Sequence, residues 1–270
     1  MAAIALQSAA SGLSALSTKL DVVANNLANV NTEGFKASRA NFQDLLYVER
    51  EQPGVETATG DQRPTGLYVG LGVKVSGTQV SFAQGAPVTT GNDLDFFIEG
   101  DGFFKVSVED SVAPGGVAYT RAGNFALNAD GEIVLANSEG RRLEPSITIP
   151  TDAIRPIQVS ADGQVLVRQP GSETLTPVGQ LELANFINPA GLKQLGANLF
   201  AETVASGTPQ EGNPLEDNRG GIRQNMLESS NVDPTRELIE LIRTQRAFEM
   251  NSQSIRTADE ALSTIAQLRR

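Results

Sequence analysis

The sequence predicts an α+β protein in which long N- and C-terminal coiled-coil-forming helices flank an all-β middle domain, with an extended arm after the first helix. Two observations support this fold class. Apolar residues recur at intervals of three and four near both ends of the chain, and short apolar runs alternate with turn dipeptides in between. The predicted segments are an N-terminal helix at 1–34, an extended arm or linker at 35–75, a β-rich domain at 76–226, and a C-terminal helix at 227–270 that pairs with the first helix.

The N-terminal helix is predicted from a continuous stripe of small and apolar residues. The stripe consists of Leu6, Ala9, Leu13, Leu16, Leu20, Val23, Leu27 and Val30. Its steps alternate between three and four residues, which is the heptad pattern of a coiled coil. Gly12 weakens the helix by about 1 kcal/mol, and Asn31 to Gly34 supply a stop signal.

The arm at 35–75 is predicted from the lack of any clear periodicity. Pro53-Gly54 and Pro64-Thr65-Gly66 interrupt it with turn signals. A structureless stretch of this length is unusual inside a compact domain. We therefore expect a neighbouring subunit to order the arm.

The middle of the chain shows the pattern of an all-β domain. Asp101-Gly102, Asp130-Gly131 and Asp162-Gly163 each separate two short runs rich in β-branched and aromatic residues. Asp-Gly between such runs is a strong hairpin signal. With no Trp and 5% aromatic residues, the core is expected to be mostly aliphatic.

The C-terminal helix is predicted to begin at Asp233-Pro234, because Asp is a favoured N-cap residue and Pro a favoured first helical residue. The stripe that follows consists of Leu238, Leu241, Gln245, Phe248, Ser252, Ile255, Ala258, Leu262 and Ile265. Polar Gln245 and Ser252 within it lower stability but can fix the register between helices.

The composition excludes several classes of function. The 270 residues contain no Cys and no His, so disulfides, Ser-His-Asp and Cys-His catalytic sites and ordinary zinc sites are ruled out by residue type. The net charge of −11 argues against nucleic acid as a partner. No cofactor is expected.

The N-terminus does not resemble a cleaved signal peptide, because residues 1–18 carry no charged side chain and hence no basic region. No apolar run approaches the ~18 residues of a membrane span. We therefore expect no membrane insertion, and either a cytoplasmic location or export by a route without a cleaved signal.

Heptad stripes at both ends of one chain favour a subunit of a tubular polymer, with the helices inside and the acidic β domain outside. Either stripe alone is explained more simply by a helix bundle or a dimeric coiled coil. It is the combination with a β-rich middle that favours the polymer.

Several segments are similar to one known family. The most specific is Asp21–Lys36. Four further segments agree with it: Gly100–Val106, Tyr119–Phe125, Glu228–Asp233 and Gln245–Asn251. Together they resemble the flagellar basal-body rod and hook family, and the resemblance runs essentially end to end.

The resemblance and the two stripes place the assembly contacts in the terminal segments. In the N-terminal segment we expect them from Leu13, Leu16, Leu20, Val23, Asn25, Asn26, Leu27, Asn29, Val30, Gly34 and Phe35. In the C-terminal segment we expect them from Leu238, Leu241, Gln245, Phe248, Asn251, Ile255 and Leu262. The asparagines are expected to form hydrogen bonds between closely packed helices.

Within the family, the arm from Gln52 to Lys74 looks most like that of distal rod members, with proximal rod and hook members as alternatives. The resemblance implies a structural subunit of a helical homopolymer that spans the periplasm and transmits torque from motor to hook. The implied partners are further copies of the chain, proximal rod subunits, the hook protein, the P- and L-ring bushings and the flagellar type III export apparatus.

Two readings from other classes remain. An enzyme or Ca²⁺ site would have to use the acidic cluster Asp93, Asp95, Glu99 and Asp101, or the loop from Asn128 to Glu132. Ordinary turn chemistry explains both more simply, and we expect no enzyme. An extracellular β-rich binding or fibre module would share the β middle, but it would not need a heptad helix at each end.

Overall fold

The computed structural model describes residues 2–54, 64–150, 154–170 and 174–268. The chain forms two compact units. Unit 1 comprises Met1–Ala28, Ser38–Val80 and Asp233–Arg270, and unit 2 comprises Asn29–Ala37 and Ser81–Val232.

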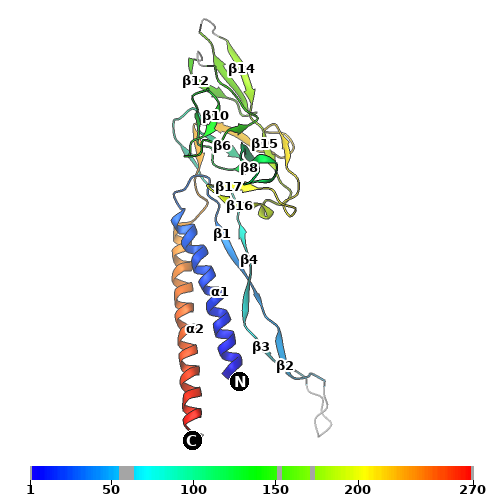
Figure 1. The fold of residues 1–270 in the computed structure, drawn as a ribbon, viewed down its shortest axis with the longest axis vertical. Helices are drawn as coiled ribbons and strands as arrows, with labels where there is room; N and C mark the ends of the chain where they lie inside the picture. Colours follow the sequence, from blue (N-terminus) through cyan, green and yellow to red (C-terminus); the bar gives the residue numbers. More distant parts are fainter. Residues whose placement is uncertain (1, 55–63, 151–153, 171–173, 269–270) are drawn as a thin grey trace. The chain divides into compact units, whose positions relative to one another are not determined.

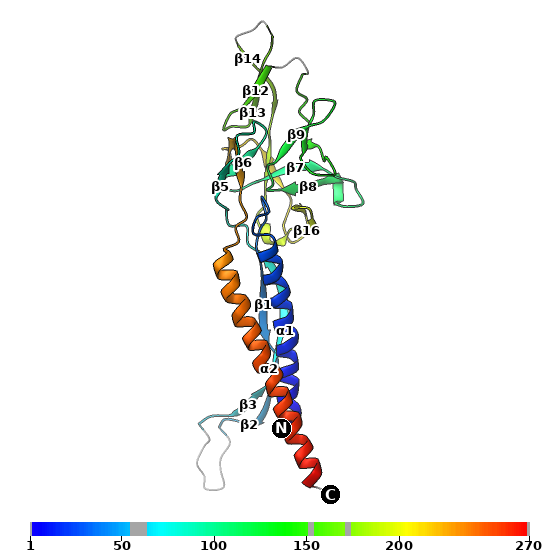
Figure 2. The same ribbon diagram turned by 90° about the vertical axis from the view of Figure 1, so that its left-hand side faces the viewer.

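Unit 1 contains two long helices, α1 (Ala2–Ala28) and α2 (Pro234–Leu268). They run side by side in opposite directions (Figures 1 and 2). The predicted start of α2 is confirmed, because Asp233 Oδ1 accepts the backbone amides of Thr235 at 3.0 Å and Arg236 at 3.3 Å. One helix at each end of the chain therefore agrees with the prediction.

Four strands complete unit 1. Strand β1 (Ser38–Asp44) pairs antiparallel with β4 (Val73–Val80), and β2 (Tyr47–Glu51) pairs antiparallel with β3 (Leu67–Gly70). The predicted extended arm is therefore wrong, because most of the described residues of that segment are in strands. These strands pair within the chain, between residues far apart in the sequence such as Ser38 and Val80, and local periodicity does not report such pairing.

The predicted coiled coil is also wrong. Within the predicted N-terminal stripe only Val23 is buried, and its leucines are half-buried. The buried face of α1 carries Gly12, Ala15 and Asn26, roughly a quarter turn away around the helix axis. Since α1 packs against β1 and β4 as well as α2, the face with small side chains is the one that allows this close approach.

Over its described residues, unit 2 is all-β apart from two short 3₁₀ turns, Pro114–Gly116 and Pro189–Gly191. Its strands in chain order are β5 (Pro87–Thr89), β6 (Phe96–Glu99), β7 (Phe103–Ser107), β8 (Val117–Thr120), β9 (Phe125–Leu127), β10 (Ile133–Leu135), β11 (Leu143–Glu144), β12 (Ile154–Val159), β13 (Gln164–Arg168), β14 (Leu175–Gln180), β15 (Leu183–Asn185), β16 (Lys193–Gly196), β17 (Leu199–Ala201), β18 (Gln210–Gly212), β19 (Gly221–Gln224) and β20 (Met226–Glu228). The β-rich middle agrees with the prediction.

The largest sheet of unit 2 has seven strands in the order β16-β17-β8-β7-β15-β18, with β11 also paired to β7. A three-stranded sheet, β12-β13-β14, and the pairs β9-β10, β6-β19 and β5-β20 complete the unit. The turns at Asp130-Gly131 and Asp162-Gly163 join paired strands, as predicted. The turn at Asp101-Gly102 does not, because β6 pairs with β19 rather than with β7.

The core of unit 2 consists of two clusters. The larger is mostly aliphatic, as expected, with Phe96, Phe104 and Phe125 among its members. The smaller is aromatic and is built around Phe103, Tyr119, Phe186 and Phe200, whose rings pack mainly edge to face. The few aromatic residues are therefore concentrated rather than spread.

Candidate assembly surfaces

The interface between α1 and α2 is partly polar. Gly12 faces Asn251, and a Cβ atom on Gly12 would lie only 3.0 Å from Asn251 Nδ2. Lys19 Nζ donates to Glu240 Oε2 at 2.7 Å. Such contacts bring the backbones close, but they bury few large apolar side chains, so most of the leucine and isoleucine surface lies elsewhere.

Asn26 forms hydrogen bonds to the start of β1 as well as the expected kind of hydrogen bond between the helices, to Glu237 of α2. Its side chain is buried, with Nδ2 donating to the Ser38 carbonyl at 2.8 Å and Oδ1 accepting the Ser38 amide at 2.9 Å. This pair of bonds imitates a strand partner at the start of β1. Burial raises the pKa of Glu237, which also has a hydrogen bond with Asn26.

The other predicted residues of α1 do not gather in one core. Leu13, Leu16, Leu20 and Leu27 are half-buried, and Asn25 is exposed. Because α2, β1 and β4 cover the small-residue face, the leucines form a partly open strip along the helix.

The predicted residues of α2 are still more open. Leu238, Phe248, Leu262 and Gln245 are exposed, whereas Leu241, Asn251 and Ile255 are half-buried. Three further apolar residues that the heptad pattern missed are also exposed: Ile239, Ile242 and Met250. The sequence could have indicated them, because they are apolar residues that lie outside the predicted stripe, on a part of the helix surface that is otherwise polar.

A second open apolar surface lies on the β2–β3 pair. Its exposed residues are Leu46, Tyr47, Val48, Leu67 and Tyr68. All five residues of β2 are exposed. A two-stranded ribbon open on both faces is marginally stable by itself, and contiguous exposed apolar surface marks an interaction site. The β2–β3 pair and the outer face of α2 are therefore the candidate assembly surfaces.

The last four predicted residues of the N-terminal segment, Asn29, Val30, Gly34 and Phe35, belong to unit 2, because α1 ends at Ala28. Gly34 has a φ of 68°, and a Cβ there would lie 2.7 Å from the Ala122 amide nitrogen. Its own amide donates to the Glu228 carbonyl at 2.8 Å. Both its backbone angle and its surroundings therefore require glycine.

Replacing Gly34 with Ala is expected to lower the free energy of unfolding of unit 2 by roughly 2–4 kcal/mol, through left-handed backbone strain and overpacking. Urea unfolding of the full chain measures this. Gly77→Ala is the control, because Gly77 has no left-handed φ and a Cβ atom added there would have no neighbour within 4 Å. Equal stability of the two variants would refute the explanation.

Three fully buried ionisable side chains meet in unit 2. Lys36 Nζ donates to Glu228 Oε1 at 2.6 Å, and Arg121 Nη1 lies 3.7 Å from Glu228 Oε2. Arg121 also donates through Nη2 to the Gly100 carbonyl at 2.8 Å and lies over the ring of Phe103. One carboxylate therefore balances two cations in the interior.

The buried environment disfavours the charged forms of Lys36 and Arg121. Burial lowers the pKa of Lys36, and the positive charge of Arg121 adds to this effect, while Glu228 opposes it. Burial likewise lowers the pKa of Arg121, again against the opposing charge of Glu228. Glu228 is therefore the group on which the cluster depends.

Asp95, Glu99 and Asn128, three of the residues considered for an enzyme or Ca²⁺ site, have structural partners. Asp95 Oδ1 accepts the side-chain amide of Asn92 at 2.8 Å, and Glu99 pairs with Arg223 at 2.6 Å. Asn128 Oδ1 accepts the backbone amides of Asp130 and Glu132, which is a turn arrangement. Among the described residues, no three His, Cys, Asp or Glu side chains are grouped so as to hold a metal ion.

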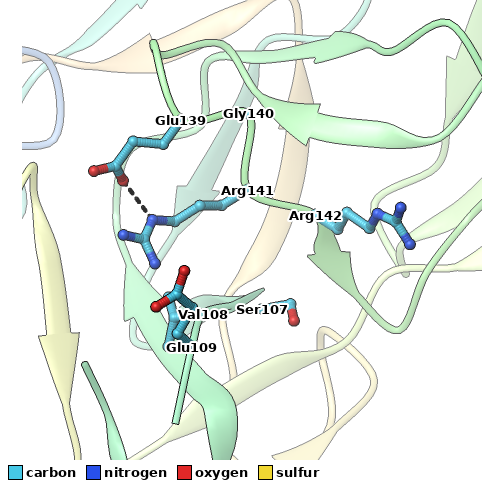
Figure 3. A pocket seen from close by; sticks show the side chains of 7 residues that line it. All are labelled: Ser107, Val108, Glu109, Glu139, Gly140, Arg141 and Arg142. Carbon is cyan, nitrogen blue, oxygen red and sulfur yellow. Dashed lines mark hydrogen bonds and ion pairs between the residues drawn. The ribbon is translucent and has the colours of Figure 1, made fainter. Parts of the chain in front are cut away.

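Figure 3 shows a surface pocket of about 520 Å³ in unit 2, lined by Ser107, Val108, Glu109, Glu139, Gly140, Arg141 and Arg142. Glu139 and Arg141 point toward one another and form an ion pair of 2.5 Å, whereas Arg142 points away. Arg141 lowers the pKa of Glu139. The pocket's main charges thus neutralise each other. Neither helix, over its described residues, is long and apolar enough to cross a membrane.

Three protein-family models match the chain. They are described as flagella basal body rod protein at residues 6–36, flagellar hook protein FlgE/F/G D1 domain at residues 97–167, and flagellar basal body rod FlgEFG protein C-terminal at residues 223–268. The chain is also similar to proteins named flagellar basal-body rod protein FlgG. That of Agrobacterium fabrum is 45% identical, over 97% of this chain and 98% of the relative. That of Caulobacter vibrioides is 44% identical over 98% and 99%, and that of Borreliella burgdorferi is 42% identical over 98% of each chain.

Proposed function

Because the chain belongs to the FlgG family of flagellar basal-body rod proteins, we propose that it polymerises into the helical tube of the distal rod and transmits torque from motor to hook. It is a structural protein of the bacterial flagellum and not an enzyme. The similarity to FlgG relatives along nearly the full chain supports the distal rod over a proximal rod or hook subunit.

The observation that carries the polymer proposal is the amount of apolar surface that unit 1 leaves open. On α2, Leu238, Ile239 and Ile242 lie within little more than one turn and are each nearly half exposed. Leu46 is 81% exposed beside β2. In a polymer, neighbouring copies cover these surfaces, and full burial of one such side chain stabilises by about 1.5–3 kcal/mol.

The proposed assembly residues are those predicted from the sequence, now with a different geometry. The partly open leucine strip of α1, Leu13 to Leu27, and the exposed Leu238, Phe248 and Leu262 of α2 contact neighbouring copies, while the small-residue faces hold α1 and α2 together within one chain. The division of the chain into four segments at 1–34, 35–75, 76–226 and 227–270 remains a prediction.

The partners of the chain belong to the same proposal. The family supports assembly with other rod and hook components. We further propose contacts with proximal rod subunits, the hook protein and the P- and L-rings, a position across the periplasm, and delivery by the flagellar type III export apparatus without a cleaved signal.

Cryo-electron microscopy of isolated basal bodies, with a tag inserted in the exposed turn at Ser138, tests the proposal. Label on the distal rod is expected. Label on the proximal rod or hook would keep the family and reject the distal position. Absence of label from the basal body would reject the function.

Residues 52–66 offer a second test, although positions 55–63 lie outside the described residues. Deleting them is expected to make the rod softer or malformed, because the exposed strands β2 and β3 would lose the segment that connects them in the sequence. A Gly-Ser segment of equal length is the control for chain length. Unaltered rods and motility after the deletion would contradict a stiffening role.

A further inference from the structure

The chain passes between the two units four times, at Ala28/Asn29, Ala37/Ser38, Val80/Ser81 and Val232/Asp233. Three of these crossings lie next to short connecting segments of unit 2, residues 34–37, 81–86 and 228–232. The contacts described below all lie within unit 2. They join these three connectors, which are far apart in the sequence.

Asn231 bonds to both of the other connectors. Its Oδ1 accepts the Ala37 amide at 2.7 Å, and its Nδ2 donates to the carbonyls of Ser81 at 2.8 Å and Ala83 at 3.0 Å. The Ser81 amide in turn donates to the Ala37 carbonyl at 2.8 Å. One amide side chain therefore bonds to the residue directly before β1 and to the residue directly after β4.

Lys36 and Glu228 join the same three connectors through buried side chains. Lys36 Nζ donates both to Glu228 Oε1 at 2.6 Å and to the Ala83 carbonyl at 2.9 Å. Glu228 Oε1 also accepts the Gly85 amide at 2.7 Å. Both side chains are about 1% exposed, so solvent screens these charged hydrogen bonds little.

From this network we infer that Lys36, Glu228 and Asn231 form a connector clamp, which fixes the directions in which three connectors leave unit 2 and so stiffens the junction through which torque passes. The inference rests on the proposed function for its mechanical purpose. The stiffening itself is a property of the single chain.

The physical basis is the small number of free torsions that remain. A connecting segment without tertiary contacts keeps the freedom of its φ and ψ torsions. Fixing the backbone of one residue costs about 1–2 kcal/mol of conformational entropy at 25 °C. Here the backbone groups of Ala37, Ser81 and Ala83 are each bonded to a clamp side chain. Turning any of these connectors relative to the rest of unit 2 therefore requires breaking several of these bonds together.

Spin-label distance measurement on the purified full chain tests the clamp. The chain has no Cys, so Ser17→Cys in unit 1 and Ser138→Cys in unit 2, both at exposed positions, can be labelled specifically. Asn231→Ala is expected to broaden the distance distribution between the labels. The matched control is Asn188→Ala, which removes a similar bond to the Ala205 carbonyl away from the connectors and should leave the distribution unchanged.

Lys36→Met provides a second variant that keeps the packing of the side chain and is also expected to broaden the distribution. If both variants fold and the width of the distance distribution is unchanged in each, the proposed clamp is wrong. If Lys36→Met fails to fold, Asn231→Ala decides the matter, because Asn231 is only half-buried. Equal broadening in Asn188→Ala would also overturn it, since the effect would then be unspecific.

The outcome is separable from the proposed function. Absence of the wild-type chain from basal bodies would reject the rod assignment and leave the width result standing. In cells whose Asn231→Ala chain still reaches the rod, motors are expected to turn normally at low load and to lose speed at high load. Normal speed at high load would remove the mechanical role of the clamp.

Discussion

Replacing Glu228 with Gln is expected to lower the free energy of unfolding of unit 2 by about 3–5 kcal/mol, the usual effect of removing one partner of a buried ion pair. The variant would leave Lys36 and Arg121 buried without the carboxylate that they share. Glutamine keeps the shape and one oxygen acceptor for the Gly85 amide. The expected loss is therefore chiefly electrostatic, and chemical unfolding of the full chain measures it.

Glu99→Gln is the matched control for this measurement. Glu99 also forms an ion pair at 2.6 Å, with Arg223, but both side chains are more than half exposed. Exposed pairs contribute about 0.2–1 kcal/mol. The double variant Lys36→Met/Glu228→Gln is expected to regain part of the loss, because one unpaired cation is removed as well. Similar losses in Glu228→Gln and Glu99→Gln would show that burial of the cluster has no energetic consequence.

The double substitution Leu238→Glu/Ile242→Glu is expected to abolish rod assembly and motility while changing the stability of the free chain by no more than about 0.5 kcal/mol. Leu238 is 47% and Ile242 49% exposed, so the single chain loses little packing. In the polymer, each copy would instead place two carboxylates in an apolar contact, and unpaired buried charge is strongly unfavourable. Counting hook-basal bodies by electron microscopy measures assembly.

Gln253→Glu/Gln267→Glu adds the same charge to exposed positions of α2 and serves as the control. It is expected to assemble normally, since it replaces polar side chains and not apolar ones. Normal assembly of the Leu238→Glu/Ile242→Glu chain would rule out this face of α2 as an assembly surface. A large stability loss in the same variant would show that the face is covered within the single chain.

Several features could be predicted from local sequence because local chemistry decides them. Asp233 and Pro234 mark the start of α2 through capping, and Asp130-Gly131 turns the chain between β9 and β10 through its backbone preferences. The segment from Asp21 to Lys36 was specific enough to indicate the family, which the comparisons then showed. These signals lie within a few residues of the structure that they specify.

The assembly residues were predicted less well, because a heptad stripe identifies apolar positions without identifying what covers them. The leucines from Leu13 to Leu27 fit the pattern but stay half-buried, whereas the chain fully buries Gly12, Ala15 and Asn26 outside the stripe. Small side chains allow α1 to approach α2 and two strands at once. The prediction omitted Ile239 and Ile242 because they lie outside the heptad stripe.

By itself, then, the sequence determined the two terminal helices, the β-rich middle, the absence of Cys and His chemistry and the family of the chain. Only the tertiary structure decided which helix face is buried, that the arm pairs as strands, and that Lys36 meets Glu228 across 192 residues. The physical reason is the range of the interactions. Capping and turn preferences act between neighbours, whereas strand pairing, close helix packing and buried ion pairs form between segments whose proximity no local pattern records.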